Sequence, residues 1–363
     1  MAGVVLVHDY LTQRGGAERV VEAMTRAFPE APLYTALYDS AASHVDLRDV
    51  TVHPLWPNAL PLLRRHHRWA LPVLAPAFSW TRIDAAVTLV SSSGWAHGVR
   101  ASGRKVVYCY APARWLYQRD RYLGGRHPGA RAALTLLGPP LTSWDRRSAR
   151  SAHRYLCVSR TTQRLIRETY GFDAEVLHPP VTFDPRGAQE EIAGMEPGFL
   201  LCVSRLLPYK NVDAVLAAAS ASPGRRVVIA GDGPERAHLE ALAGSNVRFT
   251  GEVSEAQLRW LYANSAALVA AAHEDYGLTV LEAARFGRPA AALRAGGYLE
   301  TVSDGRTGVF FDSLAPAAIA AALAALTRRQ WSPQVIKRWA ARFGEPRFSK
   351  RLQEVVADEM GRA

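Results

Sequence analysis

Cysteine is scarce in this chain of 363 residues, and long apolar runs are missing. The three cysteines, Cys109, Cys157 and Cys202, stand far apart without any C-x-x-C pair, so we expect buried, reduced thiols rather than disulfides or a zinc site. No segment reaches the ~18 consecutive apolar residues that a membrane-spanning helix needs. The first residues carry no positive charge ahead of their apolar segment, which argues against a signal peptide. The sequence therefore predicts a soluble, cytoplasmic protein.

Charge is present in excess of one sign, and it is unevenly distributed. The formal net charge is +11. Residues 1–180 hold 23 basic and 13 acidic residues, whereas residues 181–363 hold 21 basic and 20 acidic residues. The excess in the first half indicates a polyanionic partner, and nucleic acid and an anionic membrane both fit that charge. No nucleic-acid-binding motif accompanies the excess, so we expect no nucleic-acid partner.

Short apolar segments alternate with amphipathic ones along the whole chain. The expected strands are 4–7, 86–90, 106–110, 155–158, 199–203, 227–230, 266–271 and 290–293. They are apolar throughout rather than at every second position, which is typical of parallel strands covered on both faces. Alternating strands and helices predict an α/β protein with two doubly wound parallel sheets. The His178–Pro180 break predicts domains over 1–180 and 181–363.

Gly15 and Gly16 follow the first expected strand and open a helix. Glycines let a backbone approach a ligand closely, and a helix N-terminus favours anions. A tight turn without any ligand explains the pair equally well. The sequence has no G-x-G-x-x-G, so this is not a dinucleotide fingerprint.

Arg205 and Lys210 lie in a segment between the end of a strand and the start of a helix. Two cations beside a helix N-terminus are suited to hold a diphosphate. Spacing alone also fits two solvated cations on a loop.

Glu274 and Glu282 stand eight residues apart, with Gly277 and an apolar run between them. Glu282 is flanked by Val280, Leu281, Ala283 and Ala284, a poor setting for a solvated carboxylate. A partly buried carboxylate needs partners, and a sugar diol offers two hydroxyl donors. Eight helical positions turn the face by ~80° beyond two turns, so we expect Glu274 before the helix and Glu282 within it. The alternative is an amphipathic helix with one exposed glutamate.

As a set, these motifs resemble those of the family-4 retaining glycosyltransferases of the GT-B fold, in their mannosyltransferase-like branch. The segments that carry the resemblance are His8-Asp9-Tyr10-Leu11, Arg14-Gly15-Gly16-Ala17-Glu18-Arg19, His178-Pro179-Pro180-Val181, Ser204-Arg205-Leu206 with Lys210-Asn211, Gly231-Asp232-Gly233-Pro234, Glu274 with Glu282, Gly296-Gly297 with Glu300, and Asp304-Gly305 with Gly308. The resemblance covers almost the full length. It implies two Rossmann-like domains facing a cleft, the first binding the acceptor and the second a nucleotide sugar.

The resemblance also implies roles for the residues of the second half. Arg205 and Lys210 would hold the donor diphosphate, Glu274 the hydroxyls of the transferred sugar, and Glu282 those of the ribose. Backbone N–H groups of Tyr276, Gly277 and Leu278 would meet the sugar and phosphate. Phe249, Gly251 and Val253 would run beside the nucleobase.

Three further implications concern the first half. The Gly15-Gly16 loop would close over the diphosphate. His97 would act near the reacting sugar, although Gly94 occupies the position where many relatives have a histidine, so a structural imidazole is the alternative. A terminal helix at about 346–360 would cross back onto the first domain.

The activity implied is transfer of a hexose, mannose first, from GDP-mannose or a UDP-hexose to a hydroxyl of a lipid-linked saccharide, a polysaccharide precursor or a glycoside. No D-x-D motif is present, so we expect neither a metal ion nor another cofactor. The alternatives are a GT-B relative, such as a phosphorylase or a sugar-nucleotide epimerase, and a non-catalytic subunit.

The segment 60–80 is basic and rich in apolar residues. It places Arg64, Arg65, Arg68, Trp69 and Trp80 among leucine, valine and phenylalanine. Such a segment can bind an anionic membrane surface with its cations toward the headgroups. A core-packing helix with a solvated basic face is the alternative. With the charge of the first half, this favours a peripheral location on the inner face of the membrane.

Overall fold

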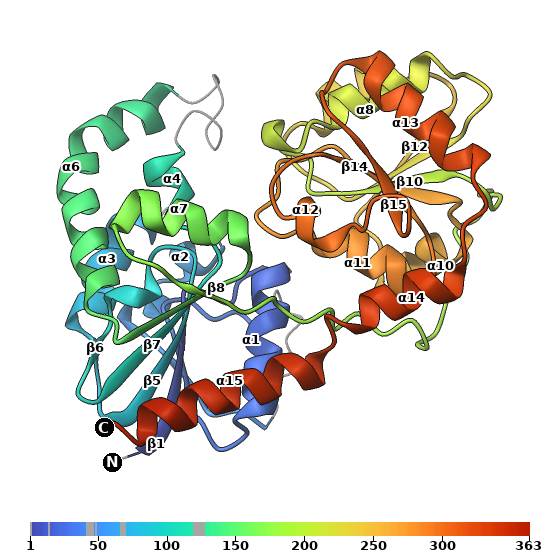
Figure 1. Cartoon of the computed structure of the whole chain (residues 1–363). Helices are drawn as coiled ribbons and strands as arrows, with labels where there is room; N and C mark the ends of the chain where they lie inside the picture. Colours follow the sequence, from blue (N-terminus) through green and yellow to red (C-terminus); the bar gives the residue numbers. More distant parts are fainter. Residues whose placement is uncertain (1, 14, 41–46, 48, 66–69, 119–127) are drawn as a thin grey trace. The chain divides into compact units, whose positions relative to one another are not determined.

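The computed structural model describes residues 2–13, 15–40, 47, 49–65, 70–118 and 128–363, and Figure 1 traces the chain through two α/β units. Unit 1 comprises residues 1–182 together with 345–363, and unit 2 comprises residues 183–344. The C-terminal helix α15 (Glu345–Met360) therefore belongs to the unit that contains the N-terminal residues.

Unit 1 is built on a seven-stranded sheet of order β3-β2-β1-β5-β7-β8-β9, with every neighbouring pair parallel. Its strands are β1 (Ala2–His8), β2 (Leu33–Thr35), β3 (Val52–Pro54), β5 (Ala85–Ser92), β7 (Arg104–Cys109), β8 (Arg154–Cys157) and β9 (Glu175–Val176). A separate pair joins β4 (Arg82–Ile83) to β6 (Arg100–Ala101).

The helices of unit 1 connect these parallel strands. They are α1 (Gly16–Ala27), α2 (Pro61–Arg65), α3 (Leu71–Trp80), α4 (Arg114–Tyr117), α6 (Pro128–Arg150) and α7 (Arg160–Tyr170), with short 3-10 turns η1 (Trp56–Ala59) and η3 (Ala96–Gly98). Helix α7 begins at a cap, because the Ser159 side chain accepts a hydrogen bond from the backbone N–H of Thr162. It ends at Gly171, whose φ of +79° suits a helix C-terminus.

Unit 2 has a six-stranded parallel sheet of order β12-β11-β10-β13-β14-β15. Its strands are β10 (Leu200–Val203), β11 (Val227–Ala230), β12 (Val247–Gly251), β13 (Ala267–Ala270), β14 (Ala290–Leu293) and β15 (Gly308–Phe311). Its helices are η5 (Pro208–Lys210), α8 (Val212–Ser220), α9 (Arg236–Leu242), α10 (Glu255–Asn264), α11 (Leu278–Arg285), α12 (Tyr298–Thr301), α13 (Pro316–Arg328) and α14 (Pro333–Ala341).

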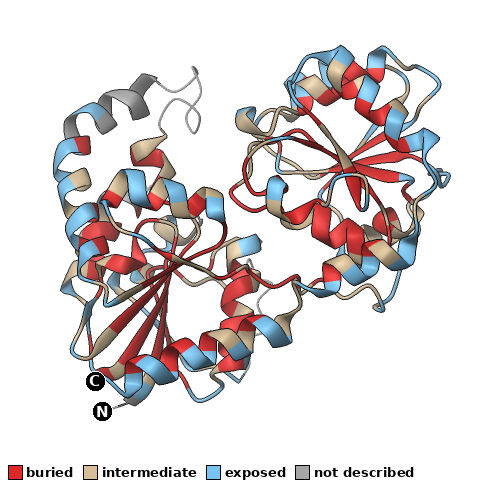
Figure 2. Cartoon of the chain, in the orientation of Figure 1, coloured by how far each residue is buried: buried red, intermediate tan, exposed pale blue. Residues whose placement is uncertain are grey.

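The central strands are buried on both faces, as their uninterrupted apolar sequences predict. Every residue of β11, β13 and β14 is buried, and Figure 2 shows the central strands of each sheet in red. Removing apolar side chains from water on both faces contributes roughly 25 cal/mol per Å², so these strands form the centre of each core. The predicted fold class, two α/β domains with doubly wound parallel sheets, is confirmed.

Helix α15 packs against unit 1 along its apolar face. Figure 1 shows it in red beside the blue β1 and α1. Phe348 meets the ring of Tyr108 edge to face, with 5.7 Å between centroids. Arg26, on α1, forms a two-point ion pair with Glu345 at 2.6 and 2.9 Å. These contacts attach the last helix to the first sheet.

Cys109, Cys157 and Cys202 are all buried with free thiols. Among the helices that the structure describes, none combines the length and the apolar composition required to cross a membrane.

Candidate active site

The strand order of unit 2 reverses between β10 and β13. From β10 the chain winds outward through β11 and β12, and from β13 it winds the other way through β14 and β15. Loops that follow β10 and β13 therefore leave in opposite directions, and parallel α/β sheets bind ligands at such a switch point. Arg205 follows β10 and Glu274 follows β13, so the two motifs singled out in the sequence meet there.

Lys210 and Glu274 are in direct contact at this switch point. The ammonium group of Lys210 donates a hydrogen bond to Oε1 of Glu274. Their side chains retain 13% and 21% of their exposure, so the pair is partly withdrawn from water. The Lys210 nitrogen also lies 5.1 Å from the centre of the Tyr209 ring. The contact places a donor suited to an anion beside an acceptor suited to hydroxyl groups.

Asn211 fixes the Lys210 loop to the loop after β13. Its φ is +52°, a left-handed conformation that asparagine tolerates better than most residues. Its side-chain nitrogen donates to the carbonyl oxygen of Ala271 at 2.9 Å. The two loops that carry the charged pair are thus joined by a second, neutral bond.

Arg205 is exposed at the carboxyl end of β10, next to the fully buried Leu206. The Leu206 N–H donates to the carbonyl of Asp232 at 2.9 Å. Gly231 has a φ of +127°, and a Cβ there would lie 2.1 Å from the Ser204 carbonyl oxygen. Glycine is therefore required where this neighbouring loop supports the backbone beneath Arg205.

Glu282 lies within α11 and is only 6% exposed. Its Oε2 accepts a hydrogen bond of 2.7 Å from the Tyr262 hydroxyl, on α10. This partner was not anticipated, because a tyrosine on an amphipathic helix gives no sequence signal for a buried carboxylate. The placement of Glu274 before α11 and of Glu282 within it is confirmed.

Gly277 is the residue that precedes α11, and its φ is +91°. A Cβ at this position would lie 2.5 Å from the ring of Tyr298. Tyr276 beside it is 5% exposed, and burial together with the charge of Glu300 raises the pKa of its phenol well above the usual range. Leu278 is the first residue of the helix, so its N–H and that of Gly277 are among the helix-terminal donors.

Gly296 and Gly297, in the loop after β14, pack against the backbone of Glu274. Gly296 has a φ of +61°, and a Cβ there would lie 2.1 Å from the carbonyl oxygen of Glu274. The Gly297 N–H donates to that same oxygen at 2.8 Å. The loop after β14 thus packs against the loop that carries Glu274 and fixes the position of its backbone.

The residues predicted beside the nucleobase lie at the carboxyl end of β12. Phe249 is half-buried in the strand, Gly251 ends it with a φ of +70°, and Val253 is half-buried in the loop that follows. A Cβ on Gly251 would lie 2.7 Å from the Arg236 guanidinium. These residues share the sheet edge of Arg205 and Glu274 but stand on the outermost strand of that side.

Unit 1 has its own switch point, between β1 and β5. Nδ1 of His8, at the end of β1, lies 3.0 Å from the Ser91 hydroxyl. That hydroxyl lies 2.8 Å from the Tyr110 hydroxyl, which donates to the Ala17 carbonyl on α1. Gly15 precedes α1 and exposed Gly16 is its first residue, so the pair does open a helix.

His97 lies inside unit 1 rather than on an open surface. It is 1% exposed, its Nδ1 lies 3.1 Å from the Ser92 hydroxyl, and its Nε2 lies 3.0 Å from Oδ1 of Asp145. Trp144 stacks on the ring, with 5.6 Å between centroids. Asp145 is fully buried and also accepts a hydrogen bond of 2.7 Å from Tyr117. In this arrangement both ring nitrogens of His97 face protein groups, and the ring has no surface open to a sugar.

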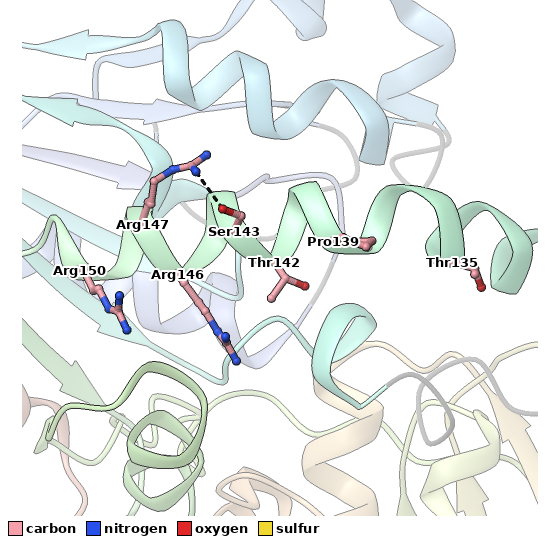
Figure 3. Close-up of a pocket in the computed structure, with 8 residues that line it drawn as sticks. Thr135, Pro139, Thr142, Ser143, Arg146, Arg147 and Arg150 are labelled. Carbon is pink, nitrogen blue, oxygen red and sulfur yellow. Dashed lines mark hydrogen bonds between the residues drawn. The ribbon is translucent and has the colours of Figure 1, made fainter.

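A groove of about 540 Å³ runs along α6 in unit 1 (Figure 3). It is lined by Thr135, Gly138, Pro139, Thr142, Ser143, Arg146, Arg147 and Arg150. Arg147 turns back to donate to Ser143 at 2.9 Å, while Arg146 and Arg150 point to the other side of the helix. The last turns of α6 therefore carry three cations. Within the described ranges, no group of three or more histidine, cysteine or acidic side chains could hold a metal ion.

Comparison with known families decides the assignment. The family model described as Glycosyltransferase Family 4 matches residues 14–184, and that of Glycosyl transferases group 1 matches residues 186–342. The chain belongs to glycosyltransferase family 4. The boundary between the two matches falls at the break between units, so each sheet corresponds to one half of the family's architecture.

Curated relatives of this chain match it over part of their length. The glycogen synthase of Thermus thermophilus is 35% identical over 169 residues, 40% of this chain and 39% of that protein. The D-inositol 3-phosphate glycosyltransferase 2 of Catenulispora acidiphila is 35% identical over 177 residues, 43% and 40% respectively. A GDP-mannose-dependent alpha-mannosyltransferase of Mycolicibacterium smegmatis is 39% identical over 111 residues, 30% and 29%. The chain thus spans about two fifths or less of each.

Among solved structures, the chain is similar to Anabaena Alr3699/HepE in complex with UDP-glucose. The TM-score is 0.71 at 15% identity, over 98% of this chain and 99% of that one. At that identity the likeness concerns the fold, which is the two-domain GT-B architecture.

Proposed function

We propose that the protein is a retaining, metal-independent hexosyltransferase that uses a nucleotide sugar. The Lys210–Glu274 contact at the switch point of unit 2, with Arg205 at the same sheet edge, is the observation that carries the proposal. A nucleoside diphosphate is a good leaving group, so the barrier lies in separating charge. Arg205, Lys210 and the N-terminus of α11 stabilise the departing phosphate electrostatically.

In the proposed reaction, the bond between the sugar C1 and the β-phosphate oxygen breaks while C1 bonds to the acceptor oxygen. The leaving phosphate takes the proton of the acceptor hydroxyl. Glu274 holds the hydroxyls of the transferred sugar and Glu282 those of the ribose. Front-face attack and a covalent intermediate both give a product with the configuration at C1 retained.

His97 acts in this proposal as a positioning residue, because its ring lies between Ser92, Asp145 and Trp144. Gly15 and Gly16, at the N-terminus of α1, contact the donor phosphate through their N–H groups. Tyr276, Gly277 and Leu278 contribute backbone donors, and Phe249, Gly251 and Val253 meet the base.

The proposed donor is GDP-mannose or a UDP-hexose, with mannose as the first choice. The mannosyltransferase relative supports the former, and the neighbour solved with UDP-glucose supports the latter. We propose an acceptor that is a lipid-linked saccharide, a polysaccharide precursor or a glycoside, bound by unit 1.

Unit 1 also carries features that favour peripheral binding to an anionic membrane, on its cytoplasmic face. Trp80 is 71% exposed and its ring stacks on that of Trp56, with 6.3 Å between centroids. Leu60 and Leu62 are 49% and 53% exposed nearby in the sequence. Exposed aromatic and leucine side chains of this kind suit a membrane interface. Arg68 and Trp69, which the sequence singled out, lie outside the described residues, as does the side chain of Arg65.

The membrane proposal is tested by sedimentation with anionic and neutral vesicles over a series of salt concentrations. We expect binding to anionic vesicles at low salt, weakened by Trp56→Ala together with Trp80→Ala. Leu242→Ala, which removes an exposed apolar side chain of unit 2, is the control and should change nothing. Absence of binding at low salt would leave a soluble glycoside as the acceptor.

The enzymatic proposal is tested by thermal shift against a panel of nucleoside diphosphates and nucleotide sugars, followed by product analysis. A transferase releases nucleoside diphosphate only when an acceptor hydroxyl or water takes the sugar, and NMR shows retention at the anomeric carbon. A phosphorylase would need inorganic phosphate and an epimerase would change the sugar without transfer. Binding without any turnover would indicate a non-catalytic subunit.

A further inference from the structure

A cavity of about 450 Å³ lies in unit 1 apart from the carboxyl ends of its strands. It is formed by η3, β6, the start of β7 and the last turns of α6. Its polar lining includes Arg100, Lys105, Arg147, Ser148, Ser151 and His153. Lys105 is the second residue of β7, so its side chain leaves the sheet near the amino end of that strand.

Lys105 is a buried cation, and none of the carboxylates that the structure describes is paired with it. It is 3% exposed, and its ammonium group donates to the carbonyls of His97 and Val99 at 2.9 and 3.0 Å and to the Ser151 hydroxyl at 2.5 Å. All three acceptors are neutral. A buried cation whose hydrogen-bond acceptors are all neutral keeps its full positive charge, and this charge attracts an anion.

The rim of the cavity adds charge of the same sign. Arg100 and Arg147 are exposed there and carry this charge. His153 is exposed as well, but partial burial and the charge of Arg104 lower its pKa, so its ring is neutral at pH 7. No residue that the structure describes in the lining is acidic. Glu359, whose charge acts on His153, lies 2.7 Å from the Arg104 guanidinium and 4.0 Å from that of Arg154. That carboxylate is therefore already neutralised, and the cavity keeps a net positive field.

We propose that this cavity binds a phosphate group, with Arg100 and Arg147 as direct donors at the rim and Lys105 as the charge at the floor. Guanidinium groups recognise phosphate oxygens in a two-point geometry. Ser148 supplies a hydroxyl donor at the wall. The Ser151 hydroxyl instead donates to the Ser148 carbonyl at 2.7 Å and holds the Lys105 ammonium group in place. The burial that lowers the pKa of Lys105 to about 8 would be offset by a bound anion. This inference is independent of the proposed transfer reaction.

The phosphate has two chemical sources, a small soluble phosphate or a lipid headgroup. The cavity wall includes Ser79, which immediately precedes Trp80, the most exposed aromatic residue of the stacked pair with Trp56. A headgroup phosphate entering the cavity would leave its acyl chains beside those rings. A soluble phosphate needs no such neighbour, so the two sources are separable by experiment.

The chain of 363 residues is titrated with inorganic phosphate at constant ionic strength, and binding is followed by the NMR signals of the His153 ring. We expect saturable binding that weakens at least fivefold in Arg147→Gln and in Lys105→Met. Arg347→Gln removes the same charge from an exposed position on α15 and should leave the affinity unchanged. Lys210→Ala should not alter the His153 titration, because that lysine lies in unit 2.

Vesicles that contain phosphatidic acid form the second arm. Binding that Arg147→Gln weakens and Arg347→Gln does not identifies a lipid headgroup; a His153 titration without such vesicle binding identifies a soluble phosphate. Both results support the site. Equal phosphate affinity of Arg147→Gln and wild type, or no His153 response in a folded wild type, overturns it. Arg147 is exposed, so its variant keeps the test valid even if Lys105→Met fails to fold.

Discussion

Lys210 donates a hydrogen bond to Oε1 of Glu274, 64 positions along the chain and on the other side of the switch point of unit 2. Each charge neutralises the other in this structure. A nucleotide sugar would give each residue a new partner in place of the other. Its diphosphate attracts the Lys210 ammonium group, and its sugar hydroxyls donate to the Glu274 carboxylate. The ion pair therefore competes with the donor for both residues.

This competition predicts an unusual effect of Glu274→Gln. The variant frees Lys210 and removes a negative charge, so free nucleoside diphosphate should bind about fivefold more tightly, roughly 1 kcal/mol. Transfer of the sugar should nonetheless fall, because a hydroxyl acceptor is lost. Isothermal calorimetry with the diphosphate, beside a turnover assay, measures both effects. Weaker diphosphate binding in Glu274→Gln would refute the competition.

Glu282 should act through the nucleotide instead. Its replacement by alanine removes a charged acceptor for the ribose hydroxyls, at roughly 1.5–3 kcal/mol, or about 10- to 100-fold in diphosphate affinity. Tyr262→Phe keeps the carboxylate but removes its 2.7 Å hydrogen-bond donor. We expect that variant to lower the unfolding free energy while changing affinity less than threefold. Calorimetry and urea denaturation separate the two, and unchanged affinity in Glu282→Ala would disprove the ribose contact.

The glycine behind Glu274 offers a test of geometry with a matched control. Gly296→Ala introduces a Cβ 2.1 Å from the Glu274 carbonyl oxygen at a φ of +61°, whereas Gly198→Ala meets nothing within 4 Å at a φ of +93°. Both variants bear backbone strain of about 1–2 kcal/mol. We expect only Gly296→Ala to lose most of its turnover, because only it displaces Glu274. Equal turnover of the two folded variants would argue against that support.

Lys105 predicts a particular pH dependence of stability. Burial lowers its pKa from 10.5 to about 8 in the folded protein, so between these values the unfolded chain binds more protons. The free energy of unfolding contributed by Lys105 therefore rises with pH from about 8 to about 10.5. Urea denaturation in phosphate-free buffer measures the unfolding free energy of wild type and of Lys105→Met. Across that pH range, the value for wild type should rise relative to the value for the variant. A constant difference would contradict the lowered pKa.

The fold was largely predictable because the information for it is local. Apolar segments such as 227–230 and 290–293 became buried parallel strands, and Gly277 separates Glu274 from the helix of Glu282 as the spacing predicted. The meeting of Lys210 with Glu274 follows from strand order, which single-strand patterns do not contain. The family resemblance implied only that both residues bind the donor.

What the sequence did not reveal depends on long-range packing. Nothing in the sequence around His97 indicates that Asp145, from α6, lies 3.0 Å from its ring, so the sequence left both a position near the sugar and a structural imidazole open. Lys105, which directly precedes the expected strand 106–110, has no sequence feature that indicates burial. Its burial arises because η3 and the end of α6 close over it, a tertiary arrangement without a local signature.

The most direct test of the account is the turnover of Lys210→Ala with the nucleotide sugar that the wild type uses. The account predicts a loss of about 10²–10³-fold in kcat, the range for removing one transition-state donor, with the fold intact by circular dichroism. Lys337→Ala removes the same charge from an exposed position of the same unit, and its kcat should stay within about twofold of wild type. A folded Lys210→Ala protein with near-normal kcat would contradict the assignment of this switch point as the donor site.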